Sequence, residues 1–286
     1  MIRTQDAAIV LFAYNRPEKL RQTLESLRAA IGALVAIYPA AVDIPIIVAL
    51  DGPRSNEGDR RAVHEVEIVV RANLPHAVIQ SERVNRGLPS LLLKTLDTLF
   101  AESPIKRAIC VEDDVQLSRT ALLSLLVASE VLGKQGHVIG AAPRHRDGSV
   151  EHQALLLDAA AHAATSSFLS GYIERFALDG DEHEGAYGGR DHAAIASWSA
   201  DIAARAGLSA PGGTSQDRMR ELAWRIADVT LAGLPVRAVR HRGLWGQHNT
   251  PWYALRTGQL WQRLDQRPWP EIEREVRRAF AQPSVR

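Results

Sequence analysis

Three consecutive carboxylates, Glu112, Asp113 and Asp114, directly follow an apolar run. Adjacent like charges repel, and the repulsion raises the pKa of each carboxyl group unless a cation lies beside them. A divalent metal held by hard oxygen ligands removes that penalty and can bind phosphates in turn. We therefore expect a metal and nucleotide-diphosphate site here. The simpler alternative is a strand that ends in a solvated acidic loop, and the rest of the N-terminal half has to decide between them.

The elements that must position this cluster alternate between strand-like and helix-like patterns. Expected strands cover 7–13, 44–50, 76–80, 105–111 and 137–141, and the expected helices among them cover 18–30, 59–72, 88–101 and 118–132. Strands separated by helices predict an α/β fold whose mainly parallel sheet is covered by helices on both faces.

Polar residues directly follow three of these strands. Tyr14, Asn15 and Arg16 come after the first strand, Asp51 after the second and the acidic cluster after the fourth. Ligands of such sheets bind at the carboxyl ends of the strands. The three segments are therefore expected to converge on one crevice.

Composition limits the function classes. A chain of 286 residues can bury a large core, and its 34 basic residues nearly balance its 33 acidic ones, so no basic field suggests a nucleic-acid partner. Cys110 is the single cysteine, which excludes an internal disulfide and fits a reducing compartment. The first apolar stretch is too short for a signal peptide or a membrane span. We expect a cytoplasmic protein.

The second half is less regular from 143 to 214, and a glycine-rich stretch at 180–189 suits either a mobile lid or an ordinary surface loop. The histidines of this region lack the spacing of a metal-binding helix and are interpreted as surface or core residues; they are His145, His152, His162 and His183. Regular patterns return with an expected helix over 215–231 and a strand-like run at 236–239.

Two later residues have a structural and a chemical interpretation. Asp217 stands at the start of the expected helix, where the helix dipole stabilises an acid, so it is either a cap or an ionised base that faces the crevice. His248 follows Gly246 closely and is either a loop histidine or a late metal ligand.

Taken together, these segments resemble the glycosyltransferases of the GT-A fold, particularly bacterial polysaccharide-type enzymes related to family two and N-acetylglucosaminyltransferases with a Glu-Asp-Asp metal motif. Residues 13–20 look like the first nucleotide loop of that family, and Asp51-Gly52 looks like its second-strand carboxylate. Residues 85–88 resemble its Asn-x-Gly-Leu element, and 112–115 resemble the metal motif itself.

The resemblance implies roles for individual residues. Nucleotide binding would fall to Ala13, Tyr14, Asn15, Arg16, Asp51, Asn85, Arg86, Glu112 and Asp113. Asp114 would be the direct metal ligand, Asp217 the catalytic base and His248 a contact of the metal or the pyrophosphate.

The implied activity is the metal-dependent transfer of a sugar from a nucleotide-diphosphate donor, with Mn²⁺ or Mg²⁺ as cofactor and a UDP-sugar favoured. The acceptor would be a saccharide, a lipid-linked or another hydroxyl compound of bacterial polysaccharide or glycoconjugate synthesis. One carboxylate acting as base predicts inversion at the anomeric carbon, whereas retention is expected without a placed carboxylate. Asp191 and Glu184 are substitutes for Asp217. Relatives often carry a tryptophan-glycine-tryptophan-like acceptor motif in the middle region. This chain has only Ala-Ser-Trp-Ser at 196–199.

Two other functions fit a nucleotide-binding sheet. A sugar-phosphate nucleotidyltransferase would carry a loop rich in glycine and arginine after the first strand, but 12–19 contains no glycine. A catalytically degenerate nucleotide-sugar-binding module is the non-enzymatic alternative. A dehydrogenase is excluded because no Gly-x-Gly-x-x-Gly follows the first strand.

The chain is expected to comprise a nucleotide-sugar-binding half at 1–142, an acceptor-side half at 143–255 that completes the same domain, and a helical tail at 256–286. The amphipathic pattern over 261–280 suits contact with the anionic inner face of a membrane or packing on the protein's own domain. Four acidic residues dilute its positive charge and favour packing.

Overall fold

The computed structural model describes residues 3–133, 135–145, 148–176, 191–241 and 262–281. Its strands are β1 (Ala7–Ala13), β2 (Ile46–Leu50), β3 (Val78–Ser81), β4 (Arg107–Glu112), β5 (Val115–Leu117), β6 (His137–Gly140), β7 (Ala154–Asp158), β8 (Thr230–Gly233) and β9 (Val239–His241). Its helices are α1 (Pro17–Ile37), α2 (Glu57–Asn73), α3 (Leu88–Glu102), α4 (Ala121–Leu132), α5 (Ala159–Arg175), α6 (His192–Arg205), α7 (Gln216–Ile226) and α9 (Trp269–Ala281), with a short 3₁₀ helix, η1 (Pro39–Asp43).

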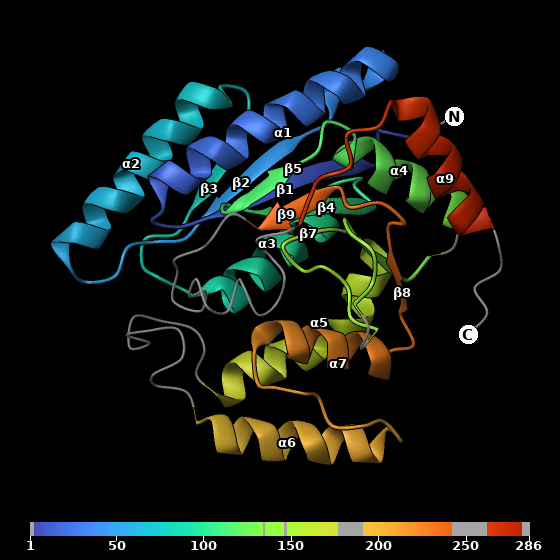
Figure 1. The fold of residues 1–286 in the computed structure, drawn as a ribbon. Coiled ribbons are helices and arrows are strands. Elements are labelled where there is room, and N and C mark those ends of the chain that lie inside the picture. Colours follow the sequence, from blue (N-terminus) through green and yellow to red (C-terminus); the bar gives the residue numbers. More distant parts are fainter. Residues whose placement is uncertain (1–2, 134, 146–147, 177–190, 242–261, 282–286) are drawn as a thin grey trace.

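A seven-stranded sheet in the order β3-β2-β1-β4-β7-β6-β8 forms the centre of the molecule (Figure 1). All pairings are parallel except those of β7, which runs antiparallel to both β4 and β6. The predicted α/β fold with a mainly parallel sheet is therefore confirmed. Strands from both halves of the chain form this one sheet. The later strand β7 lies between the earlier strands β4 and β6.

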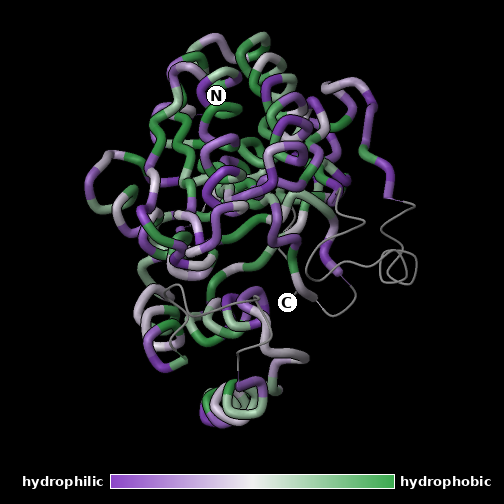
Figure 2. The backbone as a smooth tube through the Cα atoms, turned by 90° about the vertical axis from the view of Figure 1, so that its left-hand side faces the viewer, coloured by the Kyte–Doolittle hydropathy of each residue, from purple (hydrophilic) through white to green (hydrophobic). Residues whose placement is uncertain are grey.

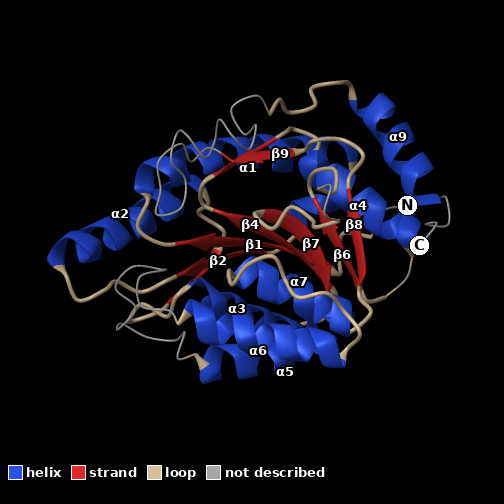
Figure 3. Cartoon of the chain, turned by 60° about the horizontal axis from the view of Figure 1, so that its bottom comes forward, coloured by secondary structure: helices blue, strands red, loops and turns tan. Residues whose placement is uncertain are grey.

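Helices cover both faces of the sheet, with α1, α2 and α4 on one side and α3 and α5 on the other, while α6 lies farther from the sheet and packs against α7 (Figures 1 and 3). Every residue of β1 is buried, as expected of a strand that is covered on both faces. The backbone coloured by hydropathy shows the apolar segments gathered in the interior (Figure 2). Residues of α3, α5, α6 and α7 form a separate small core that includes Leu169, Tyr172 and Met219.

Several elements differ from the sequence-based expectations. The less regular region contains β7, α5 and α6, whose alanine-rich helices have little amphipathic contrast to reveal them. The helix expected over 215–231 ends at Ile226, because Asp228 adopts a left-handed φ of 52° and the chain then enters β8. The strand expected at 236–239 begins only at Val239.

The C-terminal helix begins at Trp269 and not near 261. Pro268 precedes it and Pro270 lies in its first turn, where a proline is tolerated because the N–H would have no helical partner. Its apolar residues Ile272 and Val276 are fully buried in the larger core, and α9 packs against α4. This is the packing alternative that the sequence favoured, and membrane contact stays a prediction. Within the described ranges, no helix is both long and apolar enough to cross a membrane.

Replacing Ile272 by alanine tests this packing. We expect Ile272→Ala to lower the free energy of unfolding in urea by about 2–5 kcal/mol, because it leaves a cavity in a filled core. The matched control is Ile68→Ala on α2, where the isoleucine is 53% exposed and the change should stay within about 0.5 kcal/mol. Equal losses at the two sites would show that α9 does not depend on this core.

Candidate active site

The ends of β1 and β4 bring two of the predicted motifs together. The two strands are parallel neighbours in which Phe12 is paired with Glu112, so the residues that follow them leave the sheet at the same edge. The backbone N–H of Tyr14 donates to Oδ2 of Asp113 over 3.2 Å. The loop after β1 and the acidic cluster therefore form one site.

Arg16 lies across the two buried carboxylates of this site. Its Nη1 is 2.7 Å from Oδ2 of Asp114, and its Nη2 donates to Oδ1 of Asp113. Burial works against the charge of Arg16, but the fields of Asp113 and Asp114 outweigh it and raise the pKa of the guanidinium. Burial also raises the pKa of Asp113 despite this partner. Nζ of Lys19 adds a second cation 4.0 Å from Oδ2 of Asp114.

His241 completes the surroundings of Asp114. The antiparallel pairing of β5 with β9 sets Val115 opposite His241, which places Nε2 of the imidazole 3.0 Å from Oδ2 of Asp114. Burial alone would raise the pKa of Asp114, but the hydrogen bond with His241 and the charge of Arg16 outweigh it and hold that pKa at about 2. Asp114 is therefore ionised at neutral pH.

His241 was not among the residues predicted from the sequence, because the resemblance to glycosyltransferases pointed to the later histidine at 248. His248 lies outside the described residues, so its role stays a prediction. His241 could have been found from its position just after the strand-like run at 236–239. The acidic cluster stands in the same way just after its own strand.

The donor atoms present fit a divalent metal. Oδ1 of Asp114 is buried and has no hydrogen-bond partner among the described residues, which is costly for a charged oxygen. Asp113 has both oxygens occupied by Tyr14 and Arg16. No group of three or more His, Cys, Asp or Glu residues in the described ranges is arranged to hold a metal. One or two protein ligands, completed by phosphate oxygens and water, are common for Mg²⁺.

Asp51 forms a second cluster with the loop before α3. Its carboxylate accepts hydrogen bonds from the backbone N–H groups of Gly52, Arg86 and Gly87 at 2.8–3.0 Å and from Nδ2 of Asn85 at 3.0 Å. Burial raises its pKa to about 6 although the three backbone hydrogen bonds act in the opposite direction. The predicted residues Asp51, Asn85 and Arg86 thus meet, but they bind one another and hold the loop in place.

The side chains of Tyr14 and Asn15 are also used for positioning. The hydroxyl of Tyr14 and Nδ2 of Asn15 both donate to the carboxylate of Asp59, near the start of α2. Burial and this neighbouring carboxylate raise the pKa of Tyr14. Asp59, which sequence analysis did not select, therefore fixes the loop after β1.

Asp217 is not the cap of α7. Ser215 is the cap, because its hydroxyl accepts a hydrogen bond from the N–H of Arg218. Oδ1 of Asp217 is buried and has no hydrogen-bond partner among the described residues. Burial raises the pKa of Glu112 well above its usual range, and the charge of Asp217 is the next largest cause. Asp217, whose side chain is 41% exposed, therefore lies near enough to Glu112 for its charge to act there.

His152 stands beside Asp217 and was expected to be an ordinary surface or core residue. Its Nδ1 is 3.7 Å from Oδ1 of Asp217, and its Nε2 is 3.4 Å from Oε1 of Glu221. The imidazole stacks on Trp224 with a centroid distance of 5.3 Å and an interplanar angle of 8°. The substitute base Asp191 is exposed and caps α6 by accepting from the N–H of a residue three positions later. Glu184, the other substitute, lies outside the described residues.

Comparison with known proteins finds only distant structural similarity. No protein-family model and no curated protein sequence matches this chain. Glucosyl-3-phosphoglycerate synthase from Mycobacterium tuberculosis, solved with Mn²⁺, UDP and phosphoglyceric acid, has a TM-score of 0.38 and 17% identity over 61% of this chain and 66% of its own. The synthase of 4-diphosphocytidyl-2C-methyl-D-erythritol from Anaerococcus prevotii has a TM-score of 0.38 and 9% identity over 60% and 78%. Residues 1–349 of S. aureus TarS have a TM-score of 0.36 and 11% identity over 59% of this chain and 49% of that one. The chain thus spans about two thirds of the first of these structures and about half of the third.

The raised pKa of Asp51 predicts a pH-dependent stability. Because the folded state holds this proton up to pH 6 and the unfolded state only to pH 3.8, the stability contributed by protonated Asp51 is lost as the pH rises through this window. The loss should reach about 3 kcal/mol over the whole titration, of which about 2 kcal/mol falls between pH 4.5 and 7. Urea unfolding of wild type and Asp51→Asn at pH 4.5 and 7 measures it, since the variant lacks the titration. A constant difference between the two proteins would show that Asp51 does not titrate in this window.

Proposed function

We propose that this chain is a metal-dependent glycosyltransferase that takes its sugar from a nucleoside-diphosphate donor. The observation that carries the proposal is Asp114, an ionised and buried carboxylate whose Oδ1 has no partner among the described residues and whose Oδ2 contacts Arg16 and His241. A carboxylate oxygen just after the parallel strand β4, with the imidazole of His241 beside it, suits a cation that binds a diphosphate. The resemblance of the sequence to GT-A glycosyltransferases supports a UDP-sugar.

Asp114 and His241 would hold the divalent ion, Mn²⁺ or Mg²⁺. When bound, such an ion neutralises charge on the departing diphosphate. Arg16 and Lys19 lie within 4.0 Å of the same carboxylate and supply further positive charge where the phosphates would bind. Asp51 and Asp59 keep the two neighbouring loops in place, so that the backbone of 13–16 and 85–87 can line the nucleoside.

Asp217 would act as the base on the acceptor. The acceptor oxygen forms a bond with the anomeric carbon while the bond from that carbon to the diphosphate oxygen breaks. The hydroxyl proton passes to Oδ1 of Asp217, which has no hydrogen-bond partner among the described residues. A base on the face opposite the leaving group gives inversion, and a positioned base contributes about 10²–10⁴-fold to the rate.

The finer assignments rest on the sequence resemblance. We propose hydroxyl acceptors of bacterial polysaccharide or glycoconjugate synthesis, with donor binding by 1–142 and acceptor binding by 143–255. The position of Asp114 in the first part and of Asp217 in the second supports this division. Cytoplasmic location remains a prediction.

Asp217→Asn tests the proposed chemistry. The amide keeps the shape of the side chain but cannot accept the proton, so turnover should fall about 10²–10⁴-fold while UDP affinity is unchanged. Release of UDP from a panel of UDP-sugars with Mn²⁺ measures turnover. Asp191→Asn is the matched control and should keep activity, because asparagine still caps α6.

Two outcomes would contradict the proposal. Wild-type turnover by Asp217→Asn would assign the base elsewhere, with Asp191 or Glu184 as the next candidates. Release of pyrophosphate from a nucleoside triphosphate and a sugar phosphate would identify the chain as a nucleotidyltransferase.

A further inference from the structure

Arg220 is a buried cation one turn along α7 from Asp217. Arg220 is only 5% exposed, and its Nη2 donates no hydrogen bond to any described residue. The guanidinium lies 5.1 Å from the ring centre of Trp224. Such a cation–π contact offsets only part of the cost of withdrawing a charge from water and does not replace a hydrogen-bonded counter-ion.

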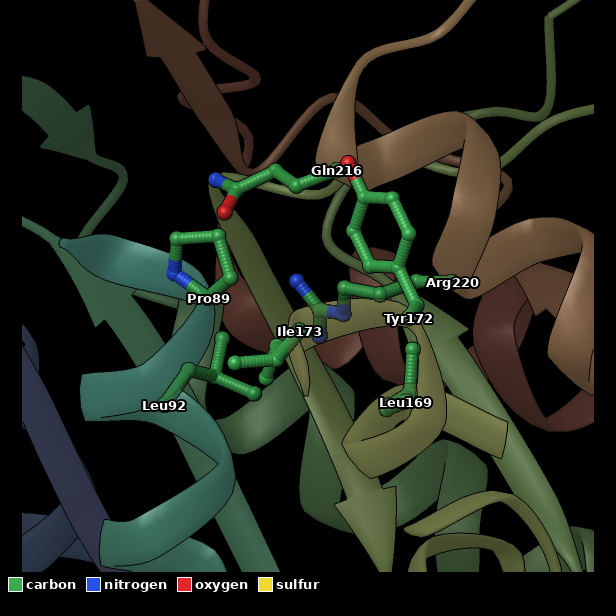
Figure 4. Close-up of a pocket in the computed structure, with 7 residues that line it drawn as sticks. All are labelled: Pro89, Leu92, Leu169, Tyr172, Ile173, Gln216 and Arg220. Atoms are coloured by element: carbon green, nitrogen blue, oxygen red, sulfur yellow. The ribbon is translucent and has the colours of Figure 1, made fainter. Parts of the chain in front are cut away.

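The guanidinium points into a niche between α3, α5 and α7 (Figure 4). Apolar walls surround it, with two neutral polar residues at the sides, and its described lining consists of Pro89, Leu92, Leu169, Tyr172, Ile173, Gln216 and Arg220. Arg220 is the only charged member of this set. The free space is about 10 Å³, which admits roughly one oxygen atom of a ligand and excludes a whole sugar.

The charge and shape of the niche select the ligand group. One guanidinium among apolar walls balances one negative charge, and its Nη2, which has no partner among the described residues, can donate to one oxygen of a carboxylate. A phosphate dianion would leave an excess charge in the same surroundings. Gln216, which adjoins the proposed base Asp217, also lines the niche. One molecule could therefore present its hydroxyl to Asp217 and reach Arg220 with a nearby acidic group.

We propose that Arg220 binds a carboxylate of the acceptor, so that the acceptor is a sugar acid or another hydroxy acid. This assignment of the substrate class rests on the proposed glycosyltransferase function. Arg220 is a binding residue in it, separate from the donor site at Asp114.

Three forms of one sugar test the proposal at equal ionic strength: D-glucuronate, neutral D-glucose and D-glucose 6-phosphate. Thermal unfolding of the wild type should show saturable stabilisation by glucuronate and none by glucose. Arg220→Met should weaken the glucuronate affinity at least about tenfold, since it removes a charged hydrogen bond. Arg220→Met should also unfold at a higher temperature than the wild type without ligand, because it removes a buried charge that has no counter-ion among the described residues.

Arg225→Met on the exposed side of the same helix is the control and should leave glucuronate binding unchanged. If Arg220→Met does not fold, Arg220→Lys takes its place and should also weaken glucuronate binding. Undiminished glucuronate binding by the Arg220 variant, or a larger shift with glucose 6-phosphate, would overturn the assignment. UDP binding to the wild type is measured in parallel. If the wild type does not bind UDP, the glycosyltransferase proposal is contradicted. The glucuronate result then still decides whether Arg220 binds a carboxylate.

Discussion

Two buried carboxylates side by side, Asp113 and Asp114, impose the constraint on which the site depends. Neither can remain ionised in a protein interior without a cation nearby. Arg16 supplies that charge to both, and His241 supplies a second contact to Asp114. These two residues come from opposite ends of the chain, so the charge balance of the site requires the loop after β1, the end of β4 and the strand β9 to be assembled together.

The sheet topology determines what this assembly faces. Because β1, β2 and β4 are parallel, their carboxyl ends place the first loop, Asp51 and the acidic cluster at one edge. The second half then contributes α7, which carries Asp217 toward Glu112 and directs Arg220 into a separate niche. In the proposed function, Asp114 would serve the donor and Asp217 the acceptor, and each has an Oδ1 without a hydrogen-bond partner among the described residues.

Strongly periodic segments predicted much of this arrangement. The apolar run of β1, the leucine-rich α3 and the carboxylates after β4 could be located without coordinates, because both the elements and their order follow from local pattern. Pairing across the chain could not. His241 reaches Asp114 through a strand of three residues, and His152 reaches Asp217 through stacking on Trp224. The use of Asp51 and Tyr14 as loop supports also depends on tertiary hydrogen bonds that no short segment encodes.

Calorimetric titration of UDP with and without Mn²⁺ tests most directly whether Asp114 belongs to a metal and diphosphate site. We compare the wild type with Asp114→Asn and with Asp201→Asn, an exposed control on α6. The account predicts that Mn²⁺ strengthens UDP binding to the wild type and to Asp201→Asn, and that Asp114→Asn loses at least about tenfold of this enhancement. The same Mn²⁺ enhancement in folded Asp114→Asn would contradict the account.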